Sequence, residues 1–200
     1  QNDMGDMGAL KLTTQKFYRI NGGSTQLEGV KSDVVMPDRY AYIDVGERDY
    51  DNPLPYDKIA PANYKIWDGY VDFDKAIRNS QERMAKSEQL ALIDENAKWI
   101  KDRREELEVT LNLDEYIDEI EERKAQTEKY KAIDKYDNKL NLKSLSSEIE
   151  LMKQDTVLRE KRKRWHENLA KDIYVEEAVN VLEDLKINNI KTEKVANIKN

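Results

Sequence analysis

The chain has 200 residues, of which 38% are hydrophobic and 38% are charged, and its formal net charge is -7. This balance argues against a nucleic-acid-binding surface, because phosphate binding needs clustered cations that carboxylates do not neutralise. The absence of cysteine excludes disulfides, thiolate nucleophiles and cysteine-ligated metals, and no apolar run approaches the roughly 20 residues that span a bilayer.

Glycine and proline divide the chain into two regions. All seven glycines and all four prolines lie before residue 70. Because these residues punctuate turns and interrupt helices, the long stretch after Gly69 is predicted to be helical. The expected fold class is α+β and predominantly α, with a short β segment followed by a multi-helix domain.

The first region opens with a strand-like run. Residues Leu10–Ile20 mix apolar, threonine and aromatic side chains as strands do, and Asn21-Gly22-Gly23-Ser24 supplies a turn. A second extended piece, Val34-Val35-Met36, stops at Pro37. Two strands cannot bury both of their faces, so this ribbon is predicted to be the edge of a larger sheet whose other strands are encoded upstream.

A tyrosine- and proline-rich connector lies between residues 38 and 69 and includes Asp51-Asn52-Pro53-Leu54-Pro55-Tyr56. Closely spaced prolines fix extended geometry and oppose a regular helix. We expect an ordered strap over a surface, because several large side chains in the connector can bury considerable area. They are Tyr56, Ile59, Tyr64, Ile66, Trp67 and Tyr70.

The second region begins with two predicted helices. The first runs from about residue 72 to 86, and its apolar face comprises Phe73, Ala76, Ile77 and Met84. Ser87 is placed to cap the next helix, which carries Leu90, Ala91, Ala97, Trp99 and Ile100. A short β-like segment, Glu108-Val109-Thr110-Leu111, then interrupts the helical pattern.

Three further predictions follow in chain order. Asn112 and Glu115 resemble a capping box for a third helix, whose apolar residues are Leu113, Tyr116, Ile117 and Ile120. After a polar loop over residues 134–146, Ser147 and Glu150 repeat the box and open a helix that continues through Leu158, Trp165 and Leu169. The last helix carries Ile173, Val175, Ala178, Val179, Leu182 and Leu185, before a polar tail over residues 187–200.

The charged and polar clusters favour structural interpretations over chemical ones. His166 is the single histidine and has no zinc-binding or base-orienting pattern around it, so we interpret it as a surface residue. The basic cluster Arg159, Lys161, Arg162, Lys163 and Arg164 is flanked by Glu160 and Glu167, which predicts a solvated helix face. The acidic pairs of the third helix, Asp114-Glu115, Asp118-Glu119 and Glu121-Glu122, lie opposite its apolar stripe and are expected to be exposed.

Gly22-Gly23-Ser24-Thr25 has the glycines of a phosphate-binding loop but not its lysine, and Ser24 lacks a nucleophile elbow and a nearby base. A turn is the better interpretation. No catalytic, cofactor-binding or metal-ligating residue is assigned, and no cofactor is expected.

Two long motifs carry a resemblance to a known family. The first is Lys16-Phe17-Tyr18-Arg19-Ile20-Asn21-Gly22-Gly23-Ser24-Thr25-Gln26, followed by Gly29-Val30 and Asp33-Val34-Val35-Met36-Pro37; the second is Asp51-Asn52-x-Leu54-Pro55-Tyr56-Asp57-x-Ile59. They closely resemble the tail-specific (C-terminal processing) serine peptidase family. Sparser marks are Val109-Thr110-Leu111-Asn112 and Asp172-x-Tyr174-x-x-Glu177-Ala178, and one departure is Ser32, where the family commonly has proline.

The resemblance implies a periplasmic endopeptidase that recognises protein C-termini through a PDZ domain and uses a serine activated by a lysine of lowered pKa. In family order the PDZ domain, the serine and the lysine precede the matched segment. A family glutamine lies four residues after that lysine, but Gln1 lacks the Gly-Lys-Gly context that precedes it, so no catalytic role is transferred.

The expected organisation is a C-terminal piece of the protease core over residues 1–38, an ordered connector over 39–70, a helical domain over 71–186 and a polar tail over 187–200. In this hypothesis the fragment is inactive by itself and shapes the access of substrates. Its partners would be protein or peptide substrates and the upstream PDZ and core segments, with possible self-association through an exposed strand; no nucleic acid is expected, and membrane contact would come only through the parent. The rival hypothesis is a stand-alone helical interaction module without enzymatic activity.

Overall fold

The structure is a computed structural model that describes residues 8, 13–66, 72–138 and 140–188. It is predominantly helical, as the sequence predicts. The chain divides into two compact units, one formed by residues 1–32 and 44–67 and the other by residues 33–43 and 68–200.

The first unit contains a crossing of two loop segments and the 3-10 helix η1 (Gly46–Asp49). Among its described residues the strand pairing is limited to two isolated antiparallel bridges, Tyr18 with Ser24 and Gly23 with Lys58. Of the strand expected over Leu10–Ile20, residues 10–12 lie outside the described part, and residues 13–20 pair only at Tyr18. A strand gains its ladder hydrogen bonds from a neighbour, so the sheet predicted for this region is absent from the described residues.

A glycine makes the crossing of the two segments possible. Gly22 has φ +82°, and a Cβ added to it would lie 2.1 Å from the Ile59 carbonyl oxygen. The Ile59 N–H donates to the Gly22 carbonyl at 2.8 Å, and the Ala62 N–H donates to the Ile20 carbonyl at 2.9 Å. Only glycine combines this positive φ with so close a backbone approach.

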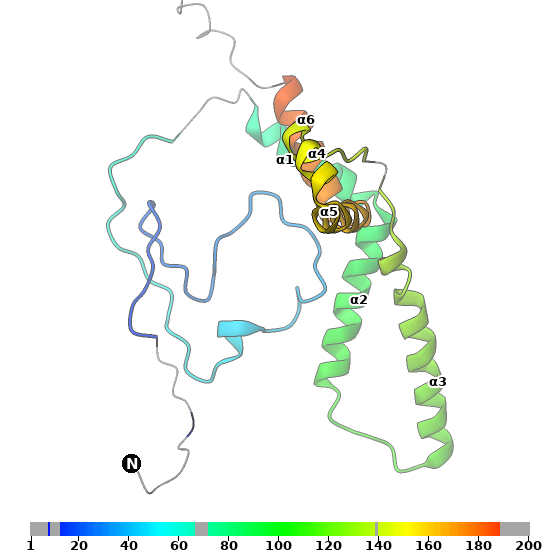
Figure 1. The fold of residues 1–200 in the computed structure, drawn as a ribbon. Helices are drawn as coiled ribbons and strands as arrows, with labels where there is room; N and C mark the ends of the chain where they lie inside the picture. Colours follow the sequence, from blue (N-terminus) through cyan, green and yellow to red (C-terminus); the bar gives the residue numbers. More distant parts are fainter. Residues whose placement is uncertain (1–7, 9–12, 67–71, 139, 189–200) are drawn as a thin grey trace, which may run out of the picture. The chain divides into compact units, whose positions relative to one another are not determined.

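The second unit is built from six α-helices among the described residues (Figure 1). They are α1 (Phe73–Ala85), α2 (Glu88–Glu105), α3 (Leu113–Tyr130), α4 (Ser146–Gln154), α5 (Thr156–Leu169) and α6 (Ile173–Asn188), with the 3-10 helix η2 (Ile133–Lys135) after α3. Helix α1 packs against α6 and α2, α2 packs against α3 and η2, and α4 packs against α5. In Figure 1 the helices α2 and α3 run side by side as a long pair joined at one end.

Side-chain caps explain where the first three helices begin. Asp72 accepts a hydrogen bond from the Lys75 N–H at 2.9 Å, and Ser87 accepts one from the Leu90 N–H at 3.3 Å, so the first two predicted helix starts are confirmed. Asn112 caps α3 through the Asp114 N–H at 3.0 Å. The reciprocal capping box is not formed there, because Glu115 accepts from the Thr110 hydroxyl at 2.7 Å instead of from the Asn112 N–H.

One predicted helix is two helices. The helix expected to run from Ser147 through Leu169 is interrupted at Asp155, whose backbone is extended with φ -119° and ψ 102°. The Asp155 carboxylate accepts from the Leu158 N–H at 2.9 Å and thereby starts α5 as a separate helix. The Ser147 cap is also wrong, because α4 begins at Ser146 after Leu145, without a side-chain cap.

The hydrophobic core of the second unit is small and lies where α1, α2 and α6 meet. Leu90 and Ile93 of α2 and Ile173 of α6 form the buried cluster, and Met36, Met84, Ile133 and Tyr136 pack against it half-buried. Many large apolar side chains elsewhere remain exposed. Within the described residues, no helix is both long enough and apolar enough to cross a membrane.

Candidate functional site

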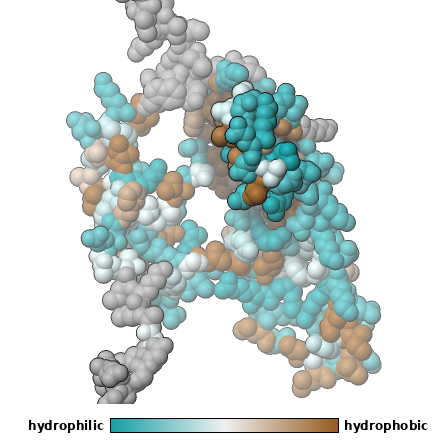
Figure 2. Space-filling view, in the orientation of Figure 1, coloured by the Kyte–Doolittle hydropathy of each residue, from teal (hydrophilic) through white to brown (hydrophobic). Residues whose placement is uncertain are grey.

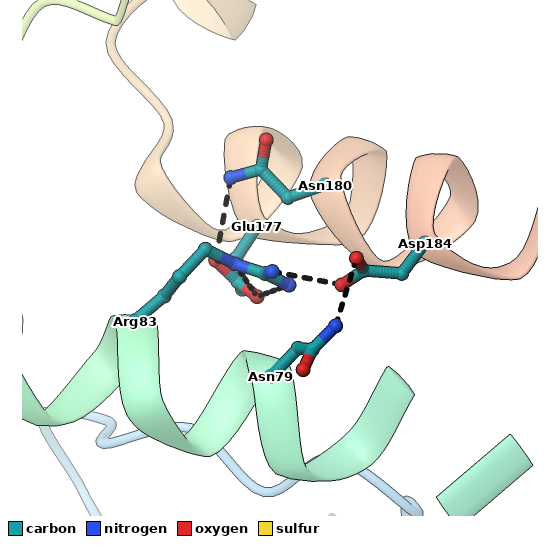
Figure 3. A network of polar contacts seen from close by, with 5 residues as sticks. All are labelled: Asn79, Arg83, Glu177, Asn180 and Asp184. Carbon is teal, nitrogen blue, oxygen red and sulfur yellow. Dashed lines mark hydrogen bonds and ion pairs between the residues drawn. The ribbon is translucent and has the colours of Figure 1, made fainter. Parts of the chain in front are cut away.

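A partly buried ionic clamp holds α1 on α6 (Figure 3). The Arg83 guanidinium donates to both oxygens of Glu177, at 2.7 and 3.1 Å, and to Asp184 at 2.8 Å. Asn79 donates to Asp184 at 3.1 Å and Asn180 donates to Glu177 at 3.4 Å. Because every charge has a partner across the two helices, the clamp specifies how α1 and α6 pair.

Three tyrosines add polar contacts within the second unit. Tyr136 donates to the Glu176 carboxylate; burial, followed by this hydrogen bond, raises the pKa of Tyr136 to about 12. Tyr174 donates to the Pro37 carbonyl at 2.8 Å and so holds the end of the Val34–Met36 segment against α6. Tyr42 donates to Asp94 of α2 at 2.6 Å. The residues before α1 therefore help to set the position of α2.

An open groove lies between α2 and α3, with a volume of about 450 Å³. We call α2, α3 and the linking residues 106–112 the arm. The rings of Trp99 and Tyr130, whose centroids are 5.5 Å apart, line the groove. Burial and then the nearby charge of Glu95 raise the pKa of Tyr130, so this phenol stays neutral at physiological pH.

Charged residues line the outer part of the groove. Arg123 of α3 forms ion pairs with Glu119 at 2.9 Å and with Glu106 at 3.4 Å, and Arg103 of α2 pairs with the same Glu106. The wall also includes Asp102 and Glu122, which have exposed side chains. An open groove with charges of both signs and two aromatic rings suits contact with a polypeptide better than enclosure of a small molecule.

The far end of the arm carries the most exposed apolar surface of α2, α3 and their link. Leu107 is 90% exposed and Val109 is 64% exposed, and Leu111, Leu113 and Ile117 are exposed with them. We call these five residues the arm tip. Figure 2 shows apolar surface gathered at the end of the α2–α3 pair. The apolar stripe predicted for the third helix is therefore largely exposed at this end.

The predicted surface residues of α5 form no catalytic arrangement. The His166 ring is half-buried and lies beside the Trp165 ring, with centroids 5.5 Å apart. Of the basic cluster, Arg162 pairs with Glu148 of α4 and stacks 5.0 Å above Trp165, while the other four cations are exposed. The cluster thus contributes in part to the packing of α4 on α5, which the sequence pattern did not indicate.

Ser24 lies in the crossing of the first unit. It is buried, its N–H donates to the Asp57 carbonyl at 3.0 Å, and its hydroxyl accepts from the Asp57 N–H at 3.2 Å. The Asp57 carboxylate accepts from the Tyr18 hydroxyl at 2.9 Å and lies 3.3 Å from the Lys16 ammonium. The two motifs of the family resemblance therefore contact each other here through hydrogen bonds that stabilise the crossing. The interpretation of Gly22–Thr25 as a turn agrees with this geometry.

The acidic pairs of α3 do not converge on a common point. Asp114, Asp118 and Glu121 are exposed. In the part of the chain that the structure describes, no group of three or more histidine, aspartate or glutamate side chains is placed to hold a metal ion.

Sequence reasoning missed two features, the Arg83 clamp and the groove. Arg83 and Asn79 lie on the same helix face as the apolar Ala76. Two polar residues on an apolar face were the sequence signal that could have indicated a polar contact there. For the groove, the Glu119–Arg123 spacing of four residues indicated an ion pair along α3 but gave no sign of α2 beside it.

Comparison with known proteins places the chain in a family. A family model described as "C-terminal domain of tail specific protease (DUF3340)" matches residues 40–186. The tail-specific protease of Haemophilus influenzae is 37% identical over 114 residues, which are 55% of this chain and 16% of that relative, so the chain spans a small part of the length of the relative it matches. No solved structure matches the chain significantly. The chain belongs to the family of C-terminal domains of tail-specific proteases.

Proposed function

We propose that the chain is the C-terminal portion of a tail-specific serine endopeptidase that degrades or processes proteins recognised by their C-termini. Its role is structural and substrate-gating: the serine nucleophile and its lysine base belong to segments outside this sequence. The family match over residues 40–186 supports the assignment to such a protease. The proposed activity of the whole enzyme follows a Ser/Lys mechanism, in which a desolvated neutral lysine takes the serine proton.

The observation that carries the gating role is the groove of the arm. Its walls are two helices joined by ion pairs such as Arg123 with Glu106, and Trp99 and Tyr130 line it as well. The clamp of Arg83 on Glu177 joins α6 to α1, the helix that leads into the arm. A rigid wall of mixed charge and aromatic surface can contact a passing unfolded chain at many points without enclosing it.

The proposed organisation follows from the same assignment. Residues 1–38 would complete the protease core, and residues 39–70 would connect this core to the gating domain. The gating domain would comprise residues 71–186, and residues 187–200 would form a polar tail. The partners would be protein substrates and the upstream PDZ and core segments, in the periplasm. The crossing at Gly22 and Ile59, which joins the two motifs, supports an ordered connector.

The gating role is tested in the parent protease by filling the groove. Asp102→Trp with Glu122→Trp places two large side chains on facing walls, and Ala125→Trp on an exposed part of α3 outside the groove is the matched control. We expect the double variant to change the cleavage rate of an unfolded protein such as casein several-fold. Cleavage of a short fluorogenic peptide should stay unchanged, because a short peptide does not need the arm.

Two results would contradict the proposal. Equal effects on casein and on the short peptide would mean that the groove acts on the catalytic machinery and not on access. Serine-dependent cleavage by the purified 200-residue chain would show that the chain itself holds a nucleophile.

The exposed arm tip favours a second candidate, a stand-alone helical interaction module without enzymatic activity. Hydrogen exchange on the purified chain separates the two. Strong protection of residues 13–20 would favour an autonomous module, whereas fast exchange there would favour a ribbon made to pair with core strands. Sedimentation should accompany the measurement, because self-pairing of the ribbon between two copies also slows exchange.

A further inference from the structure

The link between α2 and α3 is extended at both of its ends and is unpaired with any described strand. The residues that flank it, Glu106 and Asn112, are both extended, with φ -74° and ψ 104° and with φ -79° and ψ 123°. Residues 107–111, all of them described, belong to no helix or strand. The structure gives no hydrogen bond to any of their backbone N–H or carbonyl groups. Such unpaired groups are a template for pairing with another extended chain.

The side chains of this link alternate as in a strand with one apolar face. Leu107, Val109 and Leu111 recur at every second position and are exposed, while Glu108 and Thr110 lie between them. Successive side chains of an extended segment point to opposite faces. The Thr110 hydroxyl is already engaged by Glu115 at 2.7 Å, which ties the polar face to the start of α3. The three apolar side chains remain exposed and available to contact a partner.

The charges around the link indicate the charge of a partner that could bind it. From Lys101 to Arg123 there are ten carboxylates and four cations, and Glu105, Glu106 and Glu119 are paired with Lys101 or Arg123. Glu108 and Asp118 form no ion pair with any described residue. This excess of negative charge repels a second copy of the same tip and an anionic membrane surface, and it attracts cations.

We propose that residues 107–111 bind an extended polypeptide segment in which apolar and basic residues alternate, by adding it as a β-strand to the link. The backbone groups of the link supply the hydrogen bonds. Leu107, Val109 and Leu111 contact the apolar side chains of the bound segment, and the surrounding carboxylates contact its lysines or arginines. The inference rests on the geometry of the arm and does not require the gating role.

The test uses the 200-residue chain and a short fluorescein-labelled peptide in which lysine alternates with valine and leucine. Two comparison peptides carry the same residues in scrambled order and glutamate in place of lysine. We expect fluorescence anisotropy to show binding of the alternating peptide that is at least about tenfold tighter than that of either comparison peptide, and that weakens as salt increases. Hydrogen exchange should slow at residues 107–111 when this peptide is bound.

Three variants separate the parts of the proposed contact. Leu107→Ser with Leu111→Ser should weaken binding about tenfold, whereas Leu151→Ser, an exposed leucine on α4, should leave it unchanged. Glu108→Lys should weaken binding of the lysine peptide and improve binding of the glutamate peptide. Because these positions are exposed, circular dichroism should show an unchanged fold for all three.

Several outcomes would overturn the inference. Binding of the scrambled peptide as tightly as the alternating peptide would exclude strand pairing. Binding without exchange protection at residues 107–111 would place the peptide elsewhere. Concentration-dependent dimerisation, or binding to phosphatidylcholine vesicles, that the Leu107→Ser and Leu111→Ser changes abolish would identify a second copy or a lipid surface as the occupant.

Discussion

Arg83 and Glu177 lie 94 residues apart in the sequence and meet through three hydrogen bonds, at 2.7, 3.0 and 3.1 Å. Glu177 is only 6% exposed, so its charge depends on this partner. The pair joins α1 to α6, and α1 leads directly into α2 at the Ser87 cap. The position of the arm is therefore coupled to one buried ionic contact.

Replacing Arg83 by methionine should destabilise the chain. Methionine keeps much of the aliphatic volume but leaves Glu177 and Asp184 without their cation. Breaking a buried pair costs about 3–5 kcal/mol, and because Arg83 is partly exposed we expect a loss of about 2–3 kcal/mol in the free energy of unfolding. Urea denaturation measures the loss. Lys153→Met removes the exposed pair with Glu150 and should change stability by less than about 0.5 kcal/mol.

The clamp also predicts how stability changes in acid. Burial by itself raises the pKa of Glu177, but hydrogen bonds from Arg83 and Asn180 outweigh it and hold that pKa below its ordinary value; Asp184 is held below its own value in the same way, by Arg83 and Asn79. Their contribution is complete above the unfolded carboxyl pKa values of about 4, and it is lost as the pH falls through the lower folded values. The stability difference between the wild-type chain and Arg83→Met should therefore shrink below about pH 4. A constant difference from pH 7 to 3 would contradict this reading of the clamp.

Tyr136 predicts that the free energy of unfolding falls in alkali, whereas the Arg83 clamp predicts that it falls in acid. Its pKa of about 12 lies above the ordinary value of 10.0, because burial and the bond to Glu176 favour the neutral phenol in the folded chain. The contribution is complete below pH 10 and is lost as the pH rises toward 12, since the unfolded chain ionises first. Tyr136→Phe should remove this alkaline loss and cost about 1 kcal/mol at neutral pH. Thermal denaturation from pH 8 to 12 measures both effects, with the exposed Tyr50→Phe as the unaffected control.

The sequence predicted the helical region well because its signals are local. The absence of glycine and proline after Gly69 and the cap predicted at Ser87 are signals that act over a few residues, and the structure confirms the two expected helix starts. The break at Asp155 was missed because aspartate is compatible with both a helix and a cap. Its extended backbone is decided by the packing of α4 back on α5, which is a tertiary effect.

The candidate site was much less predictable, because it depends on contacts across the sequence. Nothing near Arg83 indicates that Glu177 lies opposite it, and the groove exists only where α2 and α3 lie side by side. The β-like character of Glu108–Leu111 could be read from the alternation of its residues. That its apolar face is exposed could not, because exposure depends on what the other helices cover.

The crossing of the first unit depends on Gly22, and its replacement by alanine should open it. The new Cβ would lie 2.1 Å from the Ile59 carbonyl oxygen, at a φ of +82° that alanine disfavours. Gly29 is the matched control, because it has φ +60° but open space around it. Hydrogen exchange at the Ile59 amide, which donates to Gly22, measures the local stability. We expect Gly22→Ala to lower it by about 2 kcal/mol or more and Gly29→Ala by about 1 kcal/mol, whereas equal effects would show that backbone strain and not the close approach governs the crossing.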